Sequence, residues 1–588
     1  MIVPMEKIAV IVQEKDASLA IKKLQSLGVL HVEYQNTPQG KEMGFLCEEI
    51  SLLSEAINIL SLPHIKRGML AEKYEGPGNW RFAVKHIIDS YKRIGQLEEY
   101  SQTLLNRVYE WESWGDFDPE AIRSLSNRNI FIKLFQIPLK ELKNLPQELF
   151  VKKISEKAGL VNCVVVSLKE INLPFKETSL PKMSLNQMQS RINKDSHLIE
   201  TINKDLQKHA AYLYSFIKTR ITLVKELELL RVLKGMGQEG KLVYICGYVP
   251  NAALKIIETT AFSQRWGFFS REPEEDETVP TLIRNPRWVE LINPVFKLLE
   301  IIPGYRELDI SPLFLCFLSL FFGMIIGDAG YGTVYFLFTL FLQRKLRNRF
   351  SDKLIFYLLY LFSSCAIFWG LLTGTVFGQE WYLEAGFKPL LPVLNDTKFL
   401  QAFCFFLGAF HLTLAHAWQA IRKAPSVVAL SDLGWICVLW AAFFVAKTLI
   451  LDVPFPFFGK WLIAGGLGLV IFFSNPKRNI VKTIGAGLGT VALSLMNNFT
   501  DVVSYIRLFA IGLAGVAIAD TVNTLTASLG NTSVAFFGKI LIVFLGHTIN
   551  IVLGPMSVLV HGIRLNVLEF SSHAGLSWGG VAYKPLKS

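Results

Sequence analysis

The uneven distribution of apolar residues constrains this chain more than any other feature of its sequence. Up to about Arg284 the sequence is charged and interrupted by breakers, whereas after Pro312 it is mostly apolar. Hydrophobic residues make up 51% of the chain, too many for an ordinary soluble protein of this size. A membrane-spanning helix needs about 20 predominantly apolar residues. We therefore expect an N-terminal soluble arm over residues 1–285 and an all-α, polytopic membrane domain over residues 286–588.

About eight membrane spans are predicted in the second half of the chain. Their approximate bounds are 311–327, 330–344, 354–377, 398–418, 433–451, 459–475, 488–525 and 535–570. The last two runs have nearly forty residues each, which gives roughly 55 Å of helix against a hydrocarbon core of about 30 Å. These two helices are therefore expected to tilt strongly or to extend beyond the bilayer. The glycine-rich segment Gly327–Gly332 predicts a tight turn between the first two spans.

The loops between these spans predict the topology. Basic residues gather after spans two, four and six, at Arg344, Lys345, Arg347, Arg349, Lys353, Arg422, Lys423, Lys477, Arg478 and Lys482. The opposite loops carry mainly Lys388, Lys398 and Lys460. Because basic loops stay in the cytoplasm, both termini are expected there, and the N-terminus shows no signal-peptide pattern. These loops also account for the net charge of +11, so no nucleic-acid partner is expected.

The first half of the chain predicts a small α/β lobe that is split by a long insertion. Strands are expected at Lys7–Gln13 and Val29–Tyr34, with a helix at Ser18–Leu27 between them. Further along the chain, strands at Lys241–Val249 and Gly267–Ser270 flank a predicted helix. This proximal lobe therefore comprises about 1–40 plus 241–275.

The insertion predicts a coiled coil with a second lobe at its far end. Apolar residues follow a heptad spacing from Leu185 to Leu230, interrupted at Asp195, His209 and Arg220. The outgoing helices fall within about 44–113 and the returning ones within about 184–234, with a distal lobe at about 115–175. The fold class is thus an α+β arm of two small α/β lobes joined by an antiparallel coiled coil. A coiled coil between two chains is the alternative.

One segment imitates a nucleotide-binding loop. Gly235–Leu242 nearly fits the pattern GxxxxGK[ST], but Leu242 stands where a magnesium-binding hydroxyl is needed. The segment also leaves a helix and enters a strand, which is the reverse of a phosphate loop, so it is interpreted as a helix-terminal turn. The seven cysteines show no CxxC or zinc spacing. We expect no catalytic, cofactor-binding or metal site in this chain.

Two late apolar runs each contain an arginine. Arg507 lies near the centre of the run from about Leu488 to Leu525, within the segment DVVSYIRLFAIGLA. A charge at mid-bilayer costs at least a few kcal/mol and usually faces a partner or a water path. The second run carries VHGIRLNVLEF, which includes Arg564. A guanidinium so placed predicts a functional site.

These motifs resemble the membrane subunit of rotary V-type and A-type ATPases, called subunit a or subunit I. The matching residues are Ser504, Tyr505, Arg507 and Leu508 in the first helix, and His561, Arg564, Leu565 and Glu569 in the second. The segments FFGMIIGDAGYG and GYVP also resemble this family's patterns. The resemblance implies that Arg507 is the stator arginine facing a proteolipid ring, and that the last two helices lie against that ring.

The resemblance also implies a set of ion-translocation residues, namely Arg507, Arg564, Asp501, Ser504, Tyr505, His561 and Glu569. Some of these polar groups could instead only satisfy helix–helix hydrogen bonds. For Arg564 the alternative is an anchor that snorkels or faces lipid. Some relatives carry an acid ten residues before the second arginine, where this chain has Gly554.

The function implied is that of the ion-translocating stator subunit of a V/A-type rotary ATPase or ATP synthase, with two ion half-channels and no catalysis of its own. The implied partners are the proteolipid ring (subunit c/K), peripheral stalk subunits (E/G type), the central-stalk base subunit (C/d type) and the lipid bilayer. A prokaryotic plasma membrane is the expected location. A secondary transporter with a cytoplasmic regulatory domain and a membrane-anchored coiled-coil scaffold are the alternatives.

The topology can be tested by labelling single cysteines in a background without the native ones. Cysteines at Arg347, Arg422 and Lys477 should be shielded from an impermeant thiol reagent outside intact cells, because basic loops face the cytoplasm. A cysteine at Lys388 should be labelled. The reverse labelling pattern would contradict this topology.

Overall fold

The structure is a computed structural model of the 588-residue chain. It describes residues 1–66, 78–142, 149–157, 159–169, 173–346, 353–379, 389–474, 476, 480–530 and 533–587. Five of the basic residues used for the topology, Arg347, Arg349, Lys388, Lys477 and Arg478, lie outside these described residues. The chain forms two compact units. One comprises Met1–Ile11, Leu27–Glu33 and Ile245–Lys587, and the other comprises Val12–Ser26 and Tyr34–Tyr244.

The first unit contains the proximal sheet, which joins distant parts of the chain. Its strand order is β2 (His31–Glu33), β8 (Leu242–Pro250), β1 (Met5–Gln13) and β9 (Gly267–Arg271). β1 pairs antiparallel with β9, and β2 pairs antiparallel with β8. Helix α8 (Asn251–Ser263) connects β8 to β9, and α1 (Ala17–Leu27) follows β1. The sheet therefore takes its strands from both parts of the chain that were predicted to form the proximal lobe.

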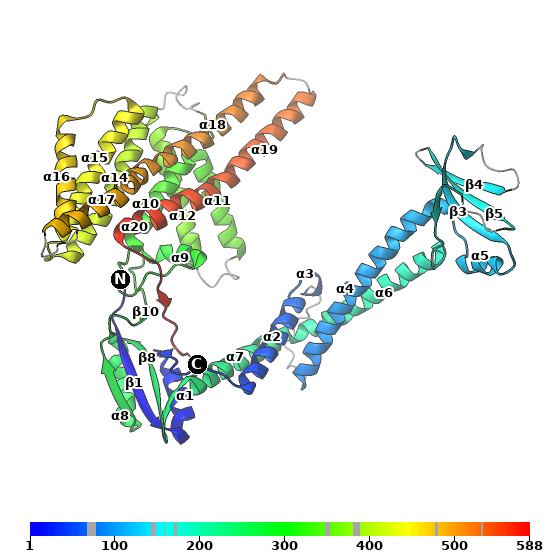
Figure 1. The fold of residues 1–588 in the computed structure, drawn as a ribbon, viewed down its shortest axis with the longest axis horizontal. Coiled ribbons are helices and arrows are strands. Elements are labelled where there is room, and N and C mark those ends of the chain that lie inside the picture. The colour runs from blue at the N-terminus through cyan, green and yellow to red at the C-terminus, as the bar shows by residue number, and fades with distance from the viewer. Residues whose placement is uncertain are drawn as a thin grey trace. The chain divides into compact units, whose positions relative to one another are not determined.

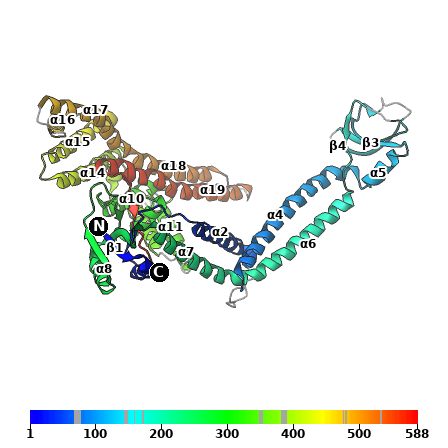
Figure 2. The same ribbon diagram turned by 60° about the horizontal axis from the view of Figure 1, so that its bottom comes forward.

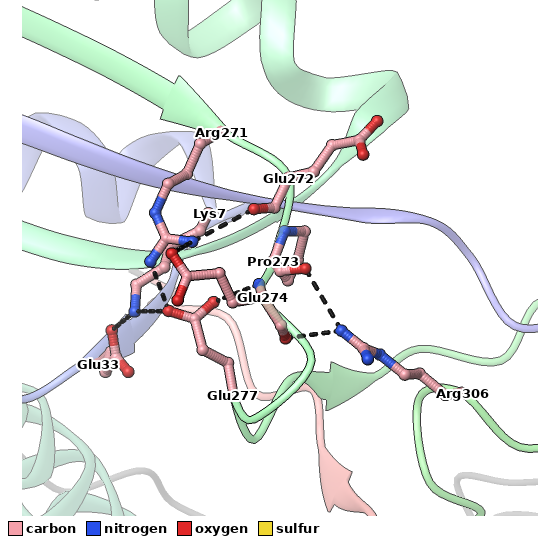
Figure 3. A network of polar contacts seen from close by, with 8 residues as sticks. All are labelled: Lys7, Glu33, Arg271, Glu272, Pro273, Glu274, Glu277 and Arg306. Carbon is pink, nitrogen blue, oxygen red and sulfur yellow. Dashed lines mark hydrogen bonds and ion pairs between the residues drawn. The ribbon is translucent and has the colours of Figure 1, made fainter.

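A network of ion pairs crosses this sheet (Figure 3). Lys7 on β1 lies 2.8 Å from a carboxylate oxygen of Glu33 and 2.7 Å from one of Glu277. Arg271, opposite Lys7 in the register, also donates to Glu277 at 2.6 Å. Burial by itself would lower the pKa of Lys7. The hydrogen bonds to Glu277 and Glu33 have the larger combined effect, so the pKa of Lys7 is raised. Burial likewise opposes the Glu277 charge, yet donation from Lys7 and Arg271 lowers the pKa of Glu277.

A C-terminal segment also joins this lobe. β11 (Val581–Ala582) pairs parallel with β10 (Pro280–Thr281). The amide of Leu586 donates to the carbonyl of Leu30 at 2.8 Å, and the hydroxyl of Tyr583 donates to the carbonyl of Val29. Burial raises the pKa of Tyr583 to about 12. The sequence did not predict this contribution, because two-residue strands carry no periodicity.

The second unit is a pair of helical runs with a sheet at one end. The outgoing run has α2 (Lys41–Leu60), the short α3 (Pro63–Lys66) and α4 (Trp80–Trp111), and the returning run has α6 (Leu185–His209) and α7 (Leu213–Gly235). α4 packs along α6, and α2 packs along α7 (Figures 1 and 2). Their buried residues include Leu60, Ile87, Leu206 and Phe216.

The returning run differs from the single heptad seam predicted from the sequence. A turn at Ala210–Tyr212 separates α6 from α7, so the run is two helices. Asp195, an exception in the heptad, is buried and accepts a 3.2 Å bond from Arg191. α7 ends at Gly235, and Gly237–Glu239 then forms β7, which pairs with β8 through a tight turn at Gly240, where φ is +64°. The segment therefore forms a β-hairpin after the end of the helix, where only a helix-terminal turn was predicted.

A second, distal sheet lies in the region that was predicted to form the distal lobe. Its order is β4 (Phe150–Lys157), β5 (Leu160–Ser167), β3 (Phe131–Pro138) and β6 (Lys176–Thr178), with every neighbouring pair antiparallel. Helix α5 (Pro119–Ser126) precedes β3. Phe135, Ile137 and Cys163 form its buried core.

The second half of the chain is helical. Its long helices are α10 (Ser311–Ile326), α11 (Ala329–Leu346), α12 (Leu354–Thr373), α14 (Thr397–Lys423), α15 (Ala429–Leu451), α16 (Phe457–Phe473), α17 (Ile480–Ser504), α18 (Ile506–Ser528) and α19 (Ser533–Ser557). Two π-helical turns, Val558–Gly562 and Leu565–Phe570, and the short α20 (Ser571–Ala574) follow. Each of the eight predicted span positions therefore contains helix, and the count of eight membrane spans stays a prediction.

Within the described residues, five of these helical runs are long and apolar enough to cross a membrane, or six if one bent pair is a single span. The bent pair is α10 and α11, and the direction of the chain bends by 120° at the break between these two helices. Gly327 at the bend has φ +63°, and Asp328 accepts backbone hydrogen bonds from Tyr331 and Gly378. α16 is shorter, at 17 residues. The last two runs, Gly487–Ser528 and Ala535–Ala574, have 42 and 40 residues. These lengths are close to the nearly forty residues predicted for each run.

The ion-pair network of the proximal lobe predicts a pH-dependent stability. Lys7→Met removes the cation shared by Glu33 and Glu277, and should destabilise the lobe by about 1–2 kcal/mol, a factor of roughly 5–30 in amide exchange. Because the pKa of Glu277 is lowered on folding, the difference should be present above pH 4.5 and shrink as the pH falls below it.

Hydrogen exchange of β1 and β9 in the full chain measures this effect. Lys255→Met on the exposed face of α8 is the matched control and should exchange like the wild type. Equal protection in Lys7→Met and wild type near neutral pH would show that the network does not stabilise the lobe.

Candidate functional site

The first arginine lies where two long helices meet. α17 ends at Ser504 and α18 begins at Ile506, so the apolar run is broken at Tyr505. Immediately after this break, the Nε of Arg507 donates to the carbonyl oxygen of Ser504 at 3.1 Å. The run is interrupted where a backbone carbonyl can help to hold a guanidinium within apolar surroundings.

The two arginines meet at one carboxylate. Arg507 Nη2 lies 2.8 Å from Glu569 Oε1, and Arg564 Nε lies 3.3 Å from the same oxygen. The Glu569 side chain is 4% exposed, compared with 24% for Arg507 and 52% for Arg564. The other oxygen of Glu569 has no hydrogen-bond partner among the described residues. The cluster therefore carries two cations on one buried anion, and keeps a surplus positive charge.

Irregular helix geometry brings these side chains together. Arg564 lies between the π-helical turns Val558–Gly562 and Leu565–Phe570, and Glu569 is in the second turn. π-helical turns occur frequently at functional sites, because they change the direction of side chains within a helix. α18 and α19 lie side by side (Figures 1 and 2). In the sequence, Arg507 belongs to the first motif and Arg564 and Glu569 belong to the second. In the structure, both arginines contact Glu569.

Tyr505 points into the protein interior. Its side chain is fully buried, and its hydroxyl lies 2.8 Å from His411 Nδ1 on α14. The His411 ring stacks between Phe317 and Phe570, with ring centroids 3.7 and 4.3 Å away. This stack joins α10, α14 and the second π-helical turn beneath the arginine cluster. Of the other predicted residues, His561 has an Nδ1 atom with no partner among the described residues.

Asp501 belongs to a chain of polar residues that the sequence analysis did not identify. Its Oδ2 lies 3.0 Å from His573 Nε2, and His573 Nδ1 lies 2.9 Å from His416 Nε2. His416 Nδ1 is 3.4 Å from Asp432 Oδ1, and Lys423 reaches the other Asp432 oxygen at 2.8 Å. These groups come from α14, α15, α17 and α20. The only sequence signal for these residues is that each is a polar residue within or beside an apolar run.

The same residues line a polar cavity of about 430 Å³. Its wall also contains Gln419, Ser431, Ser494, Asn497, Asn498 and Ser572. A cavity needs room and at least two polar partners to hold water, and this one offers both. It therefore has the room and the polar partners to hold water, and Asp501 in its wall is six residues before Arg507.

A second polar group lies further along α18 and α19. Tyr331 OH is 2.6 Å from His547 Nδ1, and His547 Nε2 is 3.1 Å from Asn523 Oδ1. Nearby, a cavity of about 140 Å³ is lined by Tyr331, Tyr335, Asn550, Gly554 and others. A Cβ atom on Gly554 would lie 2.6 Å from Ile326 and 3.0 Å from the Tyr335 hydroxyl. An acidic side chain would therefore need rearrangement at this position, in agreement with its replacement by glycine.

The fold and the charged cluster define a polytopic membrane protein with arginines in its last two long helices. No family model matched the chain. The V-type ATP synthase subunit I 1 of Treponema pallidum is 30% identical, and the match covers 100% of both chains. The V-type ATP synthase subunit I of Borreliella burgdorferi is also 30% identical, with 100% and 99% covered. The chain belongs to the subunit I family of V-type ATP synthases, which confirms the resemblance of its motifs.

Two more distant likenesses complete the comparison. The A-type ATP synthase subunit I of Methanocaldococcus jannaschii is 23% identical over 68% of this chain and 63% of its own. A crystal structure of the cytoplasmic N-terminal domain of subunit I, a homolog of subunit a of V-ATPase, matches 45% of this chain and 100% of its own. Its identity is 14% and its TM-score 0.23, too low to establish a common fold.

The buried Tyr505–His411 pair predicts a packing role for this tyrosine. Tyr505→Phe leaves His411 Nδ1 without its partner, which should cost about 1–3 kcal/mol of stability. ATP-driven ion uptake per assembled complex should stay close to the wild-type value. Thermal unfolding and vesicle uptake measure the two effects, with the exposed Tyr357→Phe as the control. Lost uptake with unchanged stability would instead place the hydroxyl in the ion path.

Proposed function

We propose that this chain is the ion-translocating stator subunit of a V/A-type rotary ATP synthase. The observation that carries the proposal is the Arg507–Glu569–Arg564 cluster within two long apolar runs. Membership of the subunit I family supports the same assignment. In this function the chain performs no ATP chemistry, and it couples ion movement to a rotor made of other subunits.

Arg507 acts on the ring through its charge. Each ring subunit carries a carboxylate that must release its ion before it passes a fixed cation. A guanidinium nearby favours the ionised carboxylate by Coulomb attraction, which is strong where water is scarce. Glu569 neutralises part of the local charge and orients Arg507, while the surplus positive charge stays available to the ring. The same cation prevents ions from passing straight between the two access paths.

Two half-channels fit the two polar regions. The 430 Å³ cavity around Asp501, His573 and His416 supplies one access path, and its chain of short contacts suits proton transfer. The group formed by Tyr331, His547 and Asn523 supplies the other path, further along α18 and α19. Asp501 is six residues before Arg507 and Asn523 is sixteen after it, so the paths approach the arginine from opposite ends of α18.

The N-terminal lobes and helical runs act as the static arm. We propose that the arm docks to peripheral stalk subunits of the E/G type and that the membrane half contacts the proteolipid ring and the C/d-type base. A prokaryotic plasma membrane with both termini in the cytoplasm is the proposed location. A secondary transporter would be expected to place a substrate site between repeated, interrupted helices. A scaffold would not need a paired arginine cluster in the membrane.

Substitution of Arg507 tests the proposal. Arg507→Ala should assemble but reduce ATP-driven ion uptake to the level measured without ATP, because the ring carboxylate loses its fixed counter-charge. Arg507→Lys should also fail largely, since a lysine ammonium lacks the planar fork and loses its proton more readily when desolvated. Arg564→Ala should be milder, because its side chain is more exposed and its contact with Glu569 is longer.

The measurement is ion uptake into vesicles that contain equal amounts of assembled complex. Lys460→Ala, an exposed cation on α16, is the matched control and should retain full uptake. Near-normal uptake by Arg507→Ala would overturn the proposed function.

A further inference from the structure

We propose that His86, Asp205 and His209 form a binding site for a divalent transition-metal ion of the Zn²⁺ class, which fastens α4 to α6. The three residues belong to the second compact unit, far in the chain from the arginine cluster. Their role does not depend on the proposed function.

The three side chains converge from two helices. His86 Nε2 on α4 lies 3.0 Å from Asp205 Oδ2 on α6. The same carboxylate oxygen lies 3.8 Å from His209 Nδ1, one turn further along α6. One ligand atom from each residue lies within 4.8 Å of the other two. Two histidines and a carboxylate are a donor set that suits Zn²⁺, with room for a water as the fourth ligand.

The spacing is close to what a tetrahedral ion requires. Metal–ligand bonds of 2.0–2.1 Å imply separations of roughly 3.3 Å between ligand atoms. The 3.0 Å between His86 Nε2 and Asp205 Oδ2 is close to that value, and one ligand atom of His209 lies within 4.8 Å of both. The His86 and Asp205 side chains are 45% and 42% exposed, which leaves them room to rotate toward an ion. That exposure also gives an ion in solution a direct path to the site.

Local hydrogen bonding prepares His209 for this role. Its Nδ1 lies 2.9 Å from the backbone carbonyl oxygen of Asp205. When Nδ1 donates to that carbonyl, Nε2 has a free lone pair for a metal, and such bonding through the second nitrogen is usual for metal-ligating histidines. The Tyr212 ring packs edge-on to His209 and helps to fix its orientation.

A simple ion pair explains less of this arrangement. An exposed pair of His86 and Asp205 would contribute only about 0–1 kcal/mol, and the 3.8 Å contact between His209 and the same carboxylate is too long for a hydrogen bond. No metal site was expected from the sequence, because the seven cysteines show no metal-binding spacing. His86 and Asp205 are separated by 119 positions, and only the pairing of α4 with α6 brings them together.

The location suggests what the ion would do. His209 is the last residue of α6, and the turn Ala210–Tyr212 separates it from α7. On the outgoing side, α2 ends at Leu60 and α4 begins at Trp80. Both helical runs are therefore interrupted near this level. An ion held by α4 and α6 would restrain the interruption and stiffen the arm.

Cobalt binding to the full-length chain tests the site. The purified protein is stripped with a chelator and titrated with Co²⁺, whose visible absorption reports ligation, and Zn²⁺ is then used to displace it. His86→Asn and His209→Asn should each weaken binding at this site by at least about tenfold, because each removes one of three protein ligands. His197→Asn, exposed on the same helix, is the matched control and should bind like the wild type. All variants keep the seven cysteines, so only differences between variants count.

Hydrogen exchange provides the second readout. Zn²⁺ should slow amide exchange across residues 205–216 in wild type and in His197→Asn, but not in His86→Asn. Exchange without metal should be the same in all variants, which shows that the substitutions leave the helices intact. Equal Co²⁺ affinity in wild type and His86→Asn would overturn the site. Binding that leaves exchange at 205–216 unchanged would overturn its role in fastening the helices.

Discussion

Two guanidinium groups share one oxygen of Glu569, and the membrane half of the structure depends on that contact. A lone arginine among apolar side chains would be costly, and a lone buried carboxylate equally so. The three groups together offset most of that cost, but leave one positive charge more than negative charge. In the proposed function, this surplus charge attracts the carboxylate of a ring subunit. Stability and the proposed function therefore arise from the same unequal pairing.

Irregularities in otherwise regular helices place this cluster. Next to the break at Tyr505, Arg507 donates to the carbonyl oxygen of Ser504. The π-helical turns after α19 bring Arg564 within 3.3 Å of Glu569. Tyr505 itself turns inward and bonds to His411, which is held between two phenylalanine rings. The surrounding aromatic packing thus fixes the backbone that carries the charges, while the polar groups beyond it stay in contact with cavities.

Local sequence patterns predicted those features that depend on composition or short spacing. Arg507 was evident because a single cation stands within a long apolar run, and the two lobes were evident from alternating strands and helices. Glu569 was included only through motif resemblance, since its contact with Arg507 spans 62 positions. His411, His416 and His573 were missed, because an isolated histidine in an apolar helix has no local signature. The turn at Ala210–Tyr212 was missed because apolar spacing continues through it.

The pairing of residues 581–586 with the proximal lobe has a consequence for biosynthesis. The lobe takes strands from near residues 5 and 245, and also the tail segment that bonds to Leu30 and to β10. The ribosome makes that segment only after every membrane helix of the second half. The lobe therefore stays incomplete until this segment, which follows the membrane helices in the sequence, has been made. Closure of the lobe thus depends on residues from both sides of the membrane half.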